Sequence, residues 1–174
     1  IGCGSGIFTE QLVGHGLDVT AVDPSEDMLS VLAKRLPEVA TLCASGEATG
    51  LTENSFDLVT YAQAWHWVDH PKASAEAARL LRDHGWLTLL WNQLDVSIPW
   101  VHRLARIMHA GDVHRPELEP PLGPEFKKPE HGIWHWSMPL DFDEIVELTK
   151  SRSYYRKATA TTQAKVEANL QWYW

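Results

Sequence analysis

The sequence predicts an α/β fold in which a mostly parallel sheet carries helices on both faces. In residues 1–91, short apolar runs that are typical of buried strands alternate with segments of helical periodicity. Helices in such positions join strands that run parallel. A glycine-rich turn over residues 2–6 lies where a first strand would pass into a first helix. We therefore expect the chain to be a fragment that lacks the first strand and also the last one.

Residues that cap or break helices mark the boundaries of the first elements. We expect a helix over 8–15 that Gly16 ends, followed by a strand over 17–22. Ser25 can cap the next helix, and Pro37 ends it. The apolar positions of this second helix, spaced for one buried face, are Leu29, Leu32, Ala33 and Leu36.

Three further strands complete the predicted sheet. Apolar runs predict them over 39–44, 56–62 and 86–91. A helix over 71–82 connects the last two, and a His84-Gly85 turn ends this connection. Its predicted buried face contains Ala73, Ala77, Leu80 and Leu81.

Past residue 91 the pattern changes. An amphipathic helix is predicted over 100–110, and the segment 115–129 holds five of the ten prolines without a clear period, so we expect a long loop there. A strand is predicted over 133–138. Asp141 and Glu144 have the spacing of a capping box for a helix that ends near residue 151, and a last helix is expected over 162–170.

Composition excludes several classes of partner. The net charge of −8 argues against a nucleic acid, because binding to phosphates requires clustered lysine and arginine. No apolar run approaches the ~20 residues that span a bilayer, so we expect no membrane partner. Two cysteines, Cys3 and Cys43, are compatible with a reducing compartment, and we expect the cytoplasm. The oligomeric state stays open.

The N-terminal turn has the chemistry of a ligand site. Gly2, Gly4 and Gly6 alternate with Cys3 and a serine, and a predicted helix follows at once. Glycine lets the backbone turn sharply and approach a ligand closely, and the start of a helix offers unpaired N–H groups. An acid, Asp23, follows Gly4 after 19 positions, at the predicted end of the next strand. At this spacing a carboxylate can accept hydrogen bonds from the hydroxyls of a ribose.

This combination resembles motif I and the second-strand acid of the class I S-adenosylmethionine-dependent methyltransferases. A dinucleotide site would require a glycine at position 7, where the chain has Ile7. The resemblance implies a Rossmann-like fold, S-adenosylmethionine as cofactor with S-adenosylhomocysteine as product, and a small-molecule acceptor. It covers residues 1–91 as the cofactor half of a single domain and leaves 92–174 as an acceptor-binding or lid half, truncated at its C-terminus.

The resemblance also implies cofactor contacts beyond the glycine turn. After Asp23, the residues Pro24, Ser25 and Met28 would line the adenine, although Met28 could equally belong to the core. In the family, an acid after the third strand accepts from the adenine amine. The segment Ala44-Ser45-Gly46-Glu47-Ala48 assigns this role to Glu47, with a backbone group near Ala48 bound to a ring nitrogen. The alternative for Glu47 is a solvent-facing loop residue.

The segment Ala62-Gln63-Ala64-Trp65-His66-Trp67-Val68-Asp69 follows the strand over 56–62. It resembles the His-containing run of small methyltransferases of the ubiquinone/menaquinone type, and most of all the group that includes trans-aconitate methyltransferase. By this resemblance Gln63 binds the amino-acid end of the cofactor. His66 is the candidate proton acceptor because its ordinary pKa suits work near pH 7. The alternative is a packed histidine without a role in catalysis. In the C-terminal half, Arg152 is a candidate partner of an acidic acceptor, or else a surface arginine.

Three other readings remain open. The pairs His66/His70 and His131/His135 have a zinc-binding spacing, but Pro71 and Gly132 disfavour helices there, and we expect no metal. An NAD-dependent oxidoreductase would require a pyrophosphate to fit the glycine turn. A non-catalytic module would keep the cofactor fold without methyl transfer.

Overall fold

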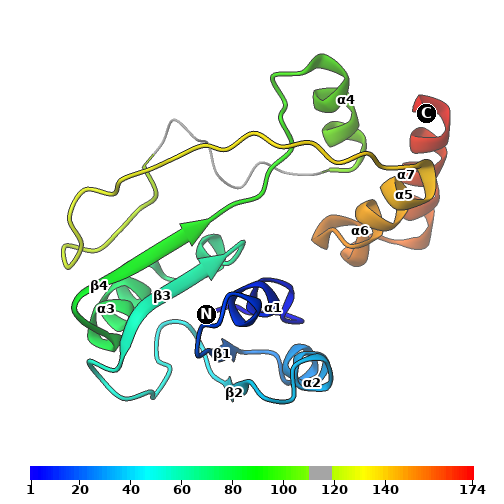
Figure 1. Cartoon of the computed structure of the whole chain (residues 1–174). Coiled ribbons are helices and arrows are strands. Elements are labelled where there is room, and N and C mark those ends of the chain that lie inside the picture. The colour runs from blue at the N-terminus through cyan, green and yellow to red at the C-terminus, as the bar shows by residue number, and fades with distance from the viewer. Residues whose placement is uncertain (110–118) are drawn as a thin grey trace. The chain divides into compact units, whose positions relative to one another are not determined.

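A computed structural model of the chain describes residues 1–109 and 119–174 (Figure 1). The chain divides into two compact units. Unit 1 comprises residues 1–92 and 116–131, and unit 2 comprises residues 93–115 and 132–174.

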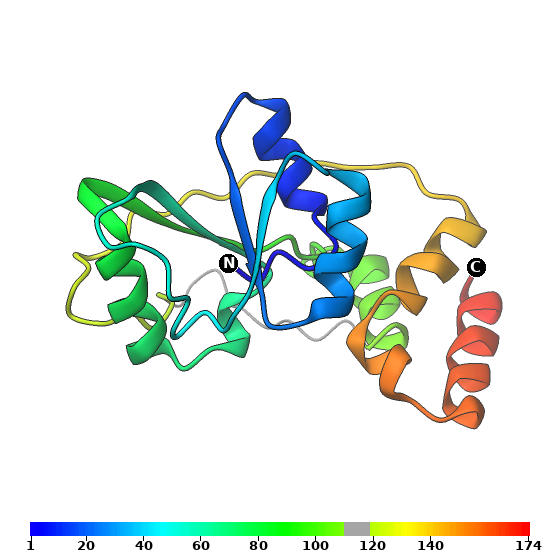
Figure 2. The same ribbon diagram turned by 90° about the horizontal axis from the view of Figure 1, so that it is seen from below.

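Unit 1 is built on two pairs of parallel strands. β1 (Thr20–Asp23) pairs with β2 (Ala40–Cys43), and β3 (Phe56–Ala62) pairs with β4 (Leu81–Leu90). The first residues of the chain lie between the pairs, as Figures 1 and 2 both show. On one side the Gly2 and Cys3 N–H groups donate to the Val22 carbonyl, and on the other the Ile1 nitrogen donates to the Thr60 carbonyl. The predicted α/β class with parallel strands is confirmed.

The three helices predicted for this part of the chain occur in the predicted order, as α1 (Ile7–Gly14), α2 (Glu26–Arg35) and α3 (His70–Leu80). A short 3-10 helix that was not predicted, η1 (Trp65–Trp67), precedes α3. Ser25 caps α2 as predicted, because its hydroxyl accepts from the Met28 N–H at 3.3 Å. Acidic residues in the first turn of α2 and basic residues in its last turn interact favourably with the helix dipole and stabilise the helix.

The core of unit 1 forms where α3 packs on β3 and β4. Tyr61, Trp65 and Leu80 are almost fully buried there, and Ala73 and Ala77 give α3 a close approach to the strands. A smaller cluster joins α2 to β1. Both clusters remove apolar side chains from water, which is the main favourable term in folding.

A segment distant in the sequence completes the surface of α3. The Trp65 indole donates to the Pro121 carbonyl at 3.0 Å, and the Gly123 N–H donates to the Ser74 hydroxyl at 2.8 Å. Leu122 packs against the same core. Residues 119–129 of the expected proline-rich loop have no helix or strand, and residues 115–118 lie outside the described residues.

Helices are the only regular elements in the described residues of unit 2. It contains α4 (Pro99–Ile107), α5 (Phe142–Lys150), α6 (Ser153–Lys157) and α7 (Ala160–Tyr173). The capping box of α5 is confirmed: the Asp141 carboxylate accepts from the Glu144 N–H at 2.9 Å, and the Glu144 carboxylate accepts from the Asp141 N–H at 2.8 Å. The buried residues between these helices are Leu104, Met108, Ile145, Tyr155, Val166 and Leu170.

The predicted strand over 133–138 is wrong. That segment is extended chain without a strand partner, and its large apolar side chains are exposed, with Trp134 at 84%. Alternating apolar residues form a strand only where another strand pairs with them.

Several predicted boundaries also differ from the structure. The strand expected over 17–22 begins only at Thr20, and Ala33 lies on the exposed face of α2. The helix α3 ends at Leu80 and β4 begins at Leu81, so the predicted strand start at residue 86 and the predicted His84-Gly85 turn are wrong. None of the helices in the described part of the chain is both long and apolar enough to span a bilayer.

Candidate functional site

The glycine turn is fixed in place by its contact with the segment after β3. Gly2 has φ +69°, and a Cβ built on it would lie 2.4 Å from the Cβ of Ala64. Only glycine therefore fits at position 2. Gly4 also has a positive φ, +53°, but a Cβ there would meet no protein atom within 4 Å. The close contact at Gly2 brings the turn to β3, while the space beside Gly4 can receive a ligand.

Asp23 joins the end of β1 to this turn. One carboxylate oxygen accepts from the Gly4 N–H at 2.8 Å, and the other accepts from the Ser25 N–H at 2.9 Å. The residue is only 8% exposed. Each oxygen can accept one further hydrogen bond, so the carboxylate can hold the turn and still bind two hydroxyls of a ligand.

Two other residues of the turn are Gly6, at the start of α1, and Cys3, which carries a thiol. Gly6 is the N-cap of α1, and no side chain caps that helix end. Its first N–H groups are therefore available to an acceptor. The Cys3 thiol is partly buried, and burial, with a smaller contribution from the nearby Asp23 carboxylate, raises its pKa to about 11. Cys3 is thus a neutral thiol at physiological pH rather than a nucleophile.

The loop after β2 approaches the start of α3. Within the loop, Ser45 and Ala48 form an isolated antiparallel bridge. One oxygen of the half-buried Glu47 carboxylate accepts from the Asp69 N–H at 2.9 Å. The second oxygen can still accept from a ligand donor. Next to Asp23, Pro24 is exposed and Met28 is half-buried.

The end of β3 holds a strained residue. Gln63 has φ +56°, a left-handed conformation that is uncommon for a residue with a side chain. Its side-chain amide donates to the Asn92 carbonyl at 2.5 Å, and its N–H donates to the Leu90 carbonyl at 2.9 Å. Such conformations cluster at functional sites. Here the strain turns the chain away from the sheet and into η1.

His66 is the middle residue of η1. Its Nδ1 atom is buried and has no hydrogen-bond partner among the described residues, while its ring lies 4.9 Å from that of Trp67. Burial lowers the pKa of the imidazole below its ordinary value. A neutral imidazole with one unpaired nitrogen is suited to accept a proton near pH 7.

Comparison with known proteins decides the family. A family model described as a methyltransferase domain matches residues 1–89. An uncharacterized methyltransferase of Mycobacterium tuberculosis is 40% identical over 166 residues, which are 95% of this chain and 68% of that protein. The chain belongs to the methyltransferase domain family. It is a class I S-adenosylmethionine-dependent methyltransferase, and the family implies that cofactor.

Two further proteins resemble this methyltransferase. A demethylmenaquinone methyltransferase of Renibacterium salmoninarum is 34% identical over 90 residues, which are 51% of this chain and 38% of that protein. A solved structure from Anaeromyxobacter dehalogenans, described as a type II methyltransferase, has a TM-score of 0.61 at 24% identity and covers 99% of this chain and 79% of that one. The structural likeness supports the Rossmann-like fold.

The methyltransferase brings some of the predicted site residues into direct contact. The Asp23 carboxylate accepts from the N–H groups of both Gly4 and Ser25. Gly2 packs on the segment that leads to His66. Other predicted residues are held by groups that the sequence analysis did not single out. Asp69 binds Glu47, and Asn92 binds Gln63. Such contacts join distant segments, so no local pattern could have indicated them.

The histidine pairs of the zinc hypothesis do not share helices. His66 lies in η1 whereas His70 begins α3, and His131 and His135 lie in extended chain. In residues 1–109 and 119–174, no group of three or more histidine, cysteine, aspartate or glutamate residues is placed to hold a metal ion.

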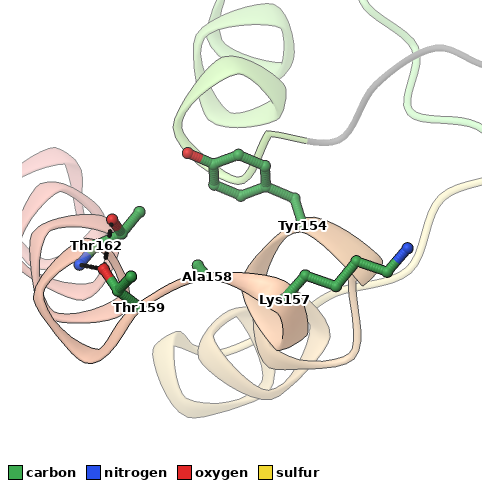
Figure 3. A pocket seen from close by; sticks show the side chains of 5 residues that line it. All are labelled: Tyr154, Lys157, Ala158, Thr159 and Thr162. Atoms are coloured by element: carbon green, nitrogen blue, oxygen red, sulfur yellow. Dashed lines mark hydrogen bonds between the residues drawn. The ribbon is translucent and has the colours of Figure 1, made fainter.

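Unit 2 of the methyltransferase contains an open depression of about 480 Å³. It lies between α6 and the start of α7, as Figure 3 shows, and is lined by Tyr154, Lys157, Ala158, Thr159 and Thr162. The Thr159 hydroxyl caps α7 by accepting from the Thr162 N–H at 3.3 Å. None of the predicted cofactor residues lines it.

Proposed function

We propose that the enzyme binds S-adenosylmethionine at the carboxyl ends of β1, β2 and β3. The Asp23 carboxylate is the observation that carries this proposal. It is buried, it holds the Gly4 N–H, and it keeps two acceptor positions for ribose hydroxyls. These groups fit an adenosyl ligand, because the carboxylate can accept from its ribose hydroxyls. The open space beside Gly4 also lets the ligand lie close to the backbone of the turn.

The remaining cofactor contacts are proposed from the same arrangement. Glu47 accepts from the adenine amine with its second carboxylate oxygen, and backbone near Ala48 binds a ring nitrogen. Pro24, Ser25 and Met28 line the adenine. Gln63 binds the amino-acid end of the cofactor, and Gly2, Cys3 and Gly6 complete the turn around it.

The main contribution of the protein to the reaction is to align the acceptor with the methyl group of the cofactor. The sulfonium of the cofactor supplies an activated methyl group, and the transfer to an acceptor is an in-line displacement. Alignment of the reacting atoms can supply ~7–11 kcal/mol of the barrier reduction in well-oriented reactions. His66 accepts the proton of an acceptor that must lose one, because burial lowers its pKa and keeps the imidazole neutral. A carboxylate acceptor would need no base.

The acceptor is proposed to be a small molecule. The name of the Renibacterium protein gives demethylmenaquinone as its substrate, and that protein is similar to this chain over 90 residues. The net charge of −8 disfavours a nucleic acid. We assign cofactor binding to residues 1–91 and acceptor recognition to residues 92–174. In that second segment the Arg152 Nε is buried without a hydrogen-bond partner among the described residues, so Arg152 can bind an anionic acceptor.

Calorimetric titration of the full-length protein with S-adenosylhomocysteine and, separately, with NAD tests the cofactor assignment. The proposal predicts binding of the first ligand alone. Binding of NAD instead would support an oxidoreductase. Incubation with methyl-labelled S-adenosylmethionine and a small-molecule cell extract, followed by mass analysis, then identifies the acceptor. The absence of a labelled product across extracts, despite cofactor binding, would indicate a non-catalytic module.

The two free cysteines fit the cytoplasmic location that we also propose.

A further inference from the structure

Within the loop over residues 44–49, three separate contacts hold residues 46–49 to the rest of unit 1. The Tyr61 hydroxyl donates to the Gly46 carbonyl at 3.1 Å, and the Asp69 N–H donates to the Glu47 carboxylate. The third contact is the most buried. The Thr49 N–H at 2.8 Å and the Thr49 hydroxyl at 2.5 Å both donate to one oxygen of Glu76.

Glu76 lies on α3 and is 8% exposed, while Thr49 is 4% exposed. The carboxylate is kept charged by the Arg79 guanidinium, whose Nε and Nη2 atoms lie 2.8 and 2.7 Å from its two oxygens. The Thr49 hydroxyl also accepts from the Leu51 N–H at 3.2 Å and so fixes the turn that follows. A buried charged group with all its partners in place holds one geometry firmly.

We propose that this clamp between Thr49 and Glu76 is a positioning device that gives the enzyme its selectivity for adenine. The clamp fixes the residue next to Ala48, and the Tyr61 hydroxyl fixes the residue before Glu47. Between these two anchors one oxygen of the Glu47 carboxylate accepts from the Asp69 N–H, and the other keeps its acceptor positions for the ligand. The inference rests on the proposed function, because it requires that Glu47 accepts from the adenine amine.

The clamp sets the orientation of the Glu47 carboxylate, and this orientation affects the choice between ligands more than the overall affinity for the cofactor. A carboxylate on a mobile loop accepts hydrogen bonds in many orientations and discriminates poorly between ligands. Held in one orientation, it favours the amine of adenine over the carbonyl oxygen that replaces it in hypoxanthine, because a carboxylate cannot donate. Loss of the clamp should therefore reduce discrimination more than it reduces binding of the rest of the cofactor.

The test compares S-adenosylhomocysteine with S-inosylhomocysteine, in which a carbonyl oxygen replaces the adenine amine. Dissociation constants for both are measured by calorimetry on the full-length protein. The wild type should bind the adenine compound at least about tenfold more tightly, the scale of a hydrogen bond to a charged group. Thr49→Val removes the hydroxyl at nearly constant volume and should bring the ratio to about twofold. Thr49→Ser restores the hydroxyl and should restore the ratio.

Two further variants separate positioning from stability. Ser74→Ala removes another buried hydrogen bond of α3, the one to Gly123 at 2.8 Å, and should lower the melting temperature without changing the ratio. Tyr61→Phe removes the second anchor of the loop and should lower the ratio by itself, even if Thr49→Val does not fold.

A wild type that binds neither compound would overturn the proposed function and this inference with it. A wild type that discriminates, with Thr49→Val and Tyr61→Phe that discriminate equally well, would overturn the clamp alone. Equal weakening of both compounds in these variants would also overturn it, because that result indicates a general structural role.

Discussion

Replacement of Asp23 by asparagine should separate the two tasks of this carboxylate. Asparagine keeps one acceptor oxygen but places an NH₂ group beside the N–H of Gly4 or of Ser25, which lie 2.8 and 2.9 Å from the present oxygens. Two donors then face each other. Leaving one buried N–H without an acceptor should lower the free energy of unfolding by ~1–3 kcal/mol.

The effect on cofactor binding should add to this loss. A ribose hydroxyl that donates to a charged carboxylate contributes ~1.5–3 kcal/mol, so Asp23→Asn should weaken S-adenosylhomocysteine binding by about 10- to 150-fold. Calorimetry gives the affinity, and urea unfolding gives the stability. Asp18→Asn is the matched control, because Asp18 is an exposed carboxylate in the segment before β1 and should leave both values unchanged. A folded Asp23→Asn protein with an affinity within about twofold of the wild type would refute the assignment of the ribose site.

Three further predictions follow from individual residues. Gly2→Ala should lower the melting temperature strongly, because its Cβ would lie 2.4 Å from that of Ala64. Gly4→Ala should cost only about 1–2 kcal/mol of backbone strain and mainly weaken S-adenosylhomocysteine binding. Equal melting temperatures for these two variants would contradict the packing at Gly2. Because burial lowers the pKa of His66, the acidic limb of kcat/KM against pH should have its midpoint below 6.5 and disappear in His66→Gln, and an unchanged limb would show that His66 is not the base. The pKa of Glu76 is lowered from 4.5 to about 2, chiefly by the hydrogen bond from the Arg79 side chain, so its contribution to stability is fully present above pH 4.5 and is lost as the pH falls toward 2. Glu76→Gln should accordingly flatten the dependence of urea-unfolding stability on pH in that window, and an unaltered slope would contradict the lowered pKa.

Local signals predicted the fold of unit 1 well. β3 has the predicted bounds Phe56–Ala62, and the cap at Ser25 lies where its side chain indicated. In unit 2 the same holds for the capping box at Asp141. These features depend on interactions within a few residues, which a sequence displays directly. The glycine turn and the place of Asp23 at the end of β1 were also predictable, because a sharp turn requires glycine and the apolar residues of the strand stop at Val22.

Contacts between distant segments were not predictable. The Thr49 and Glu76 pair spans 27 positions, and the Trp65 and Pro121 contact spans 56. Neither has a periodicity that a single sequence reveals. The wrong strand over 133–138 has the opposite cause: its apolar residues alternate as in a strand, but a strand also needs a partner, and local patterns do not show one.

The central claim is that the Asp23 carboxylate and the glycine turn together hold the adenosyl group. A crystal structure of the enzyme with S-adenosylhomocysteine tests this most directly. We predict that the ribose hydroxyls lie within about 3.2 Å of the Asp23 oxygens, with the ligand passing over the open face of Gly4. A ligand bound elsewhere, with the Asp23 carboxylate in contact only with Gly4 and Ser25, would contradict it.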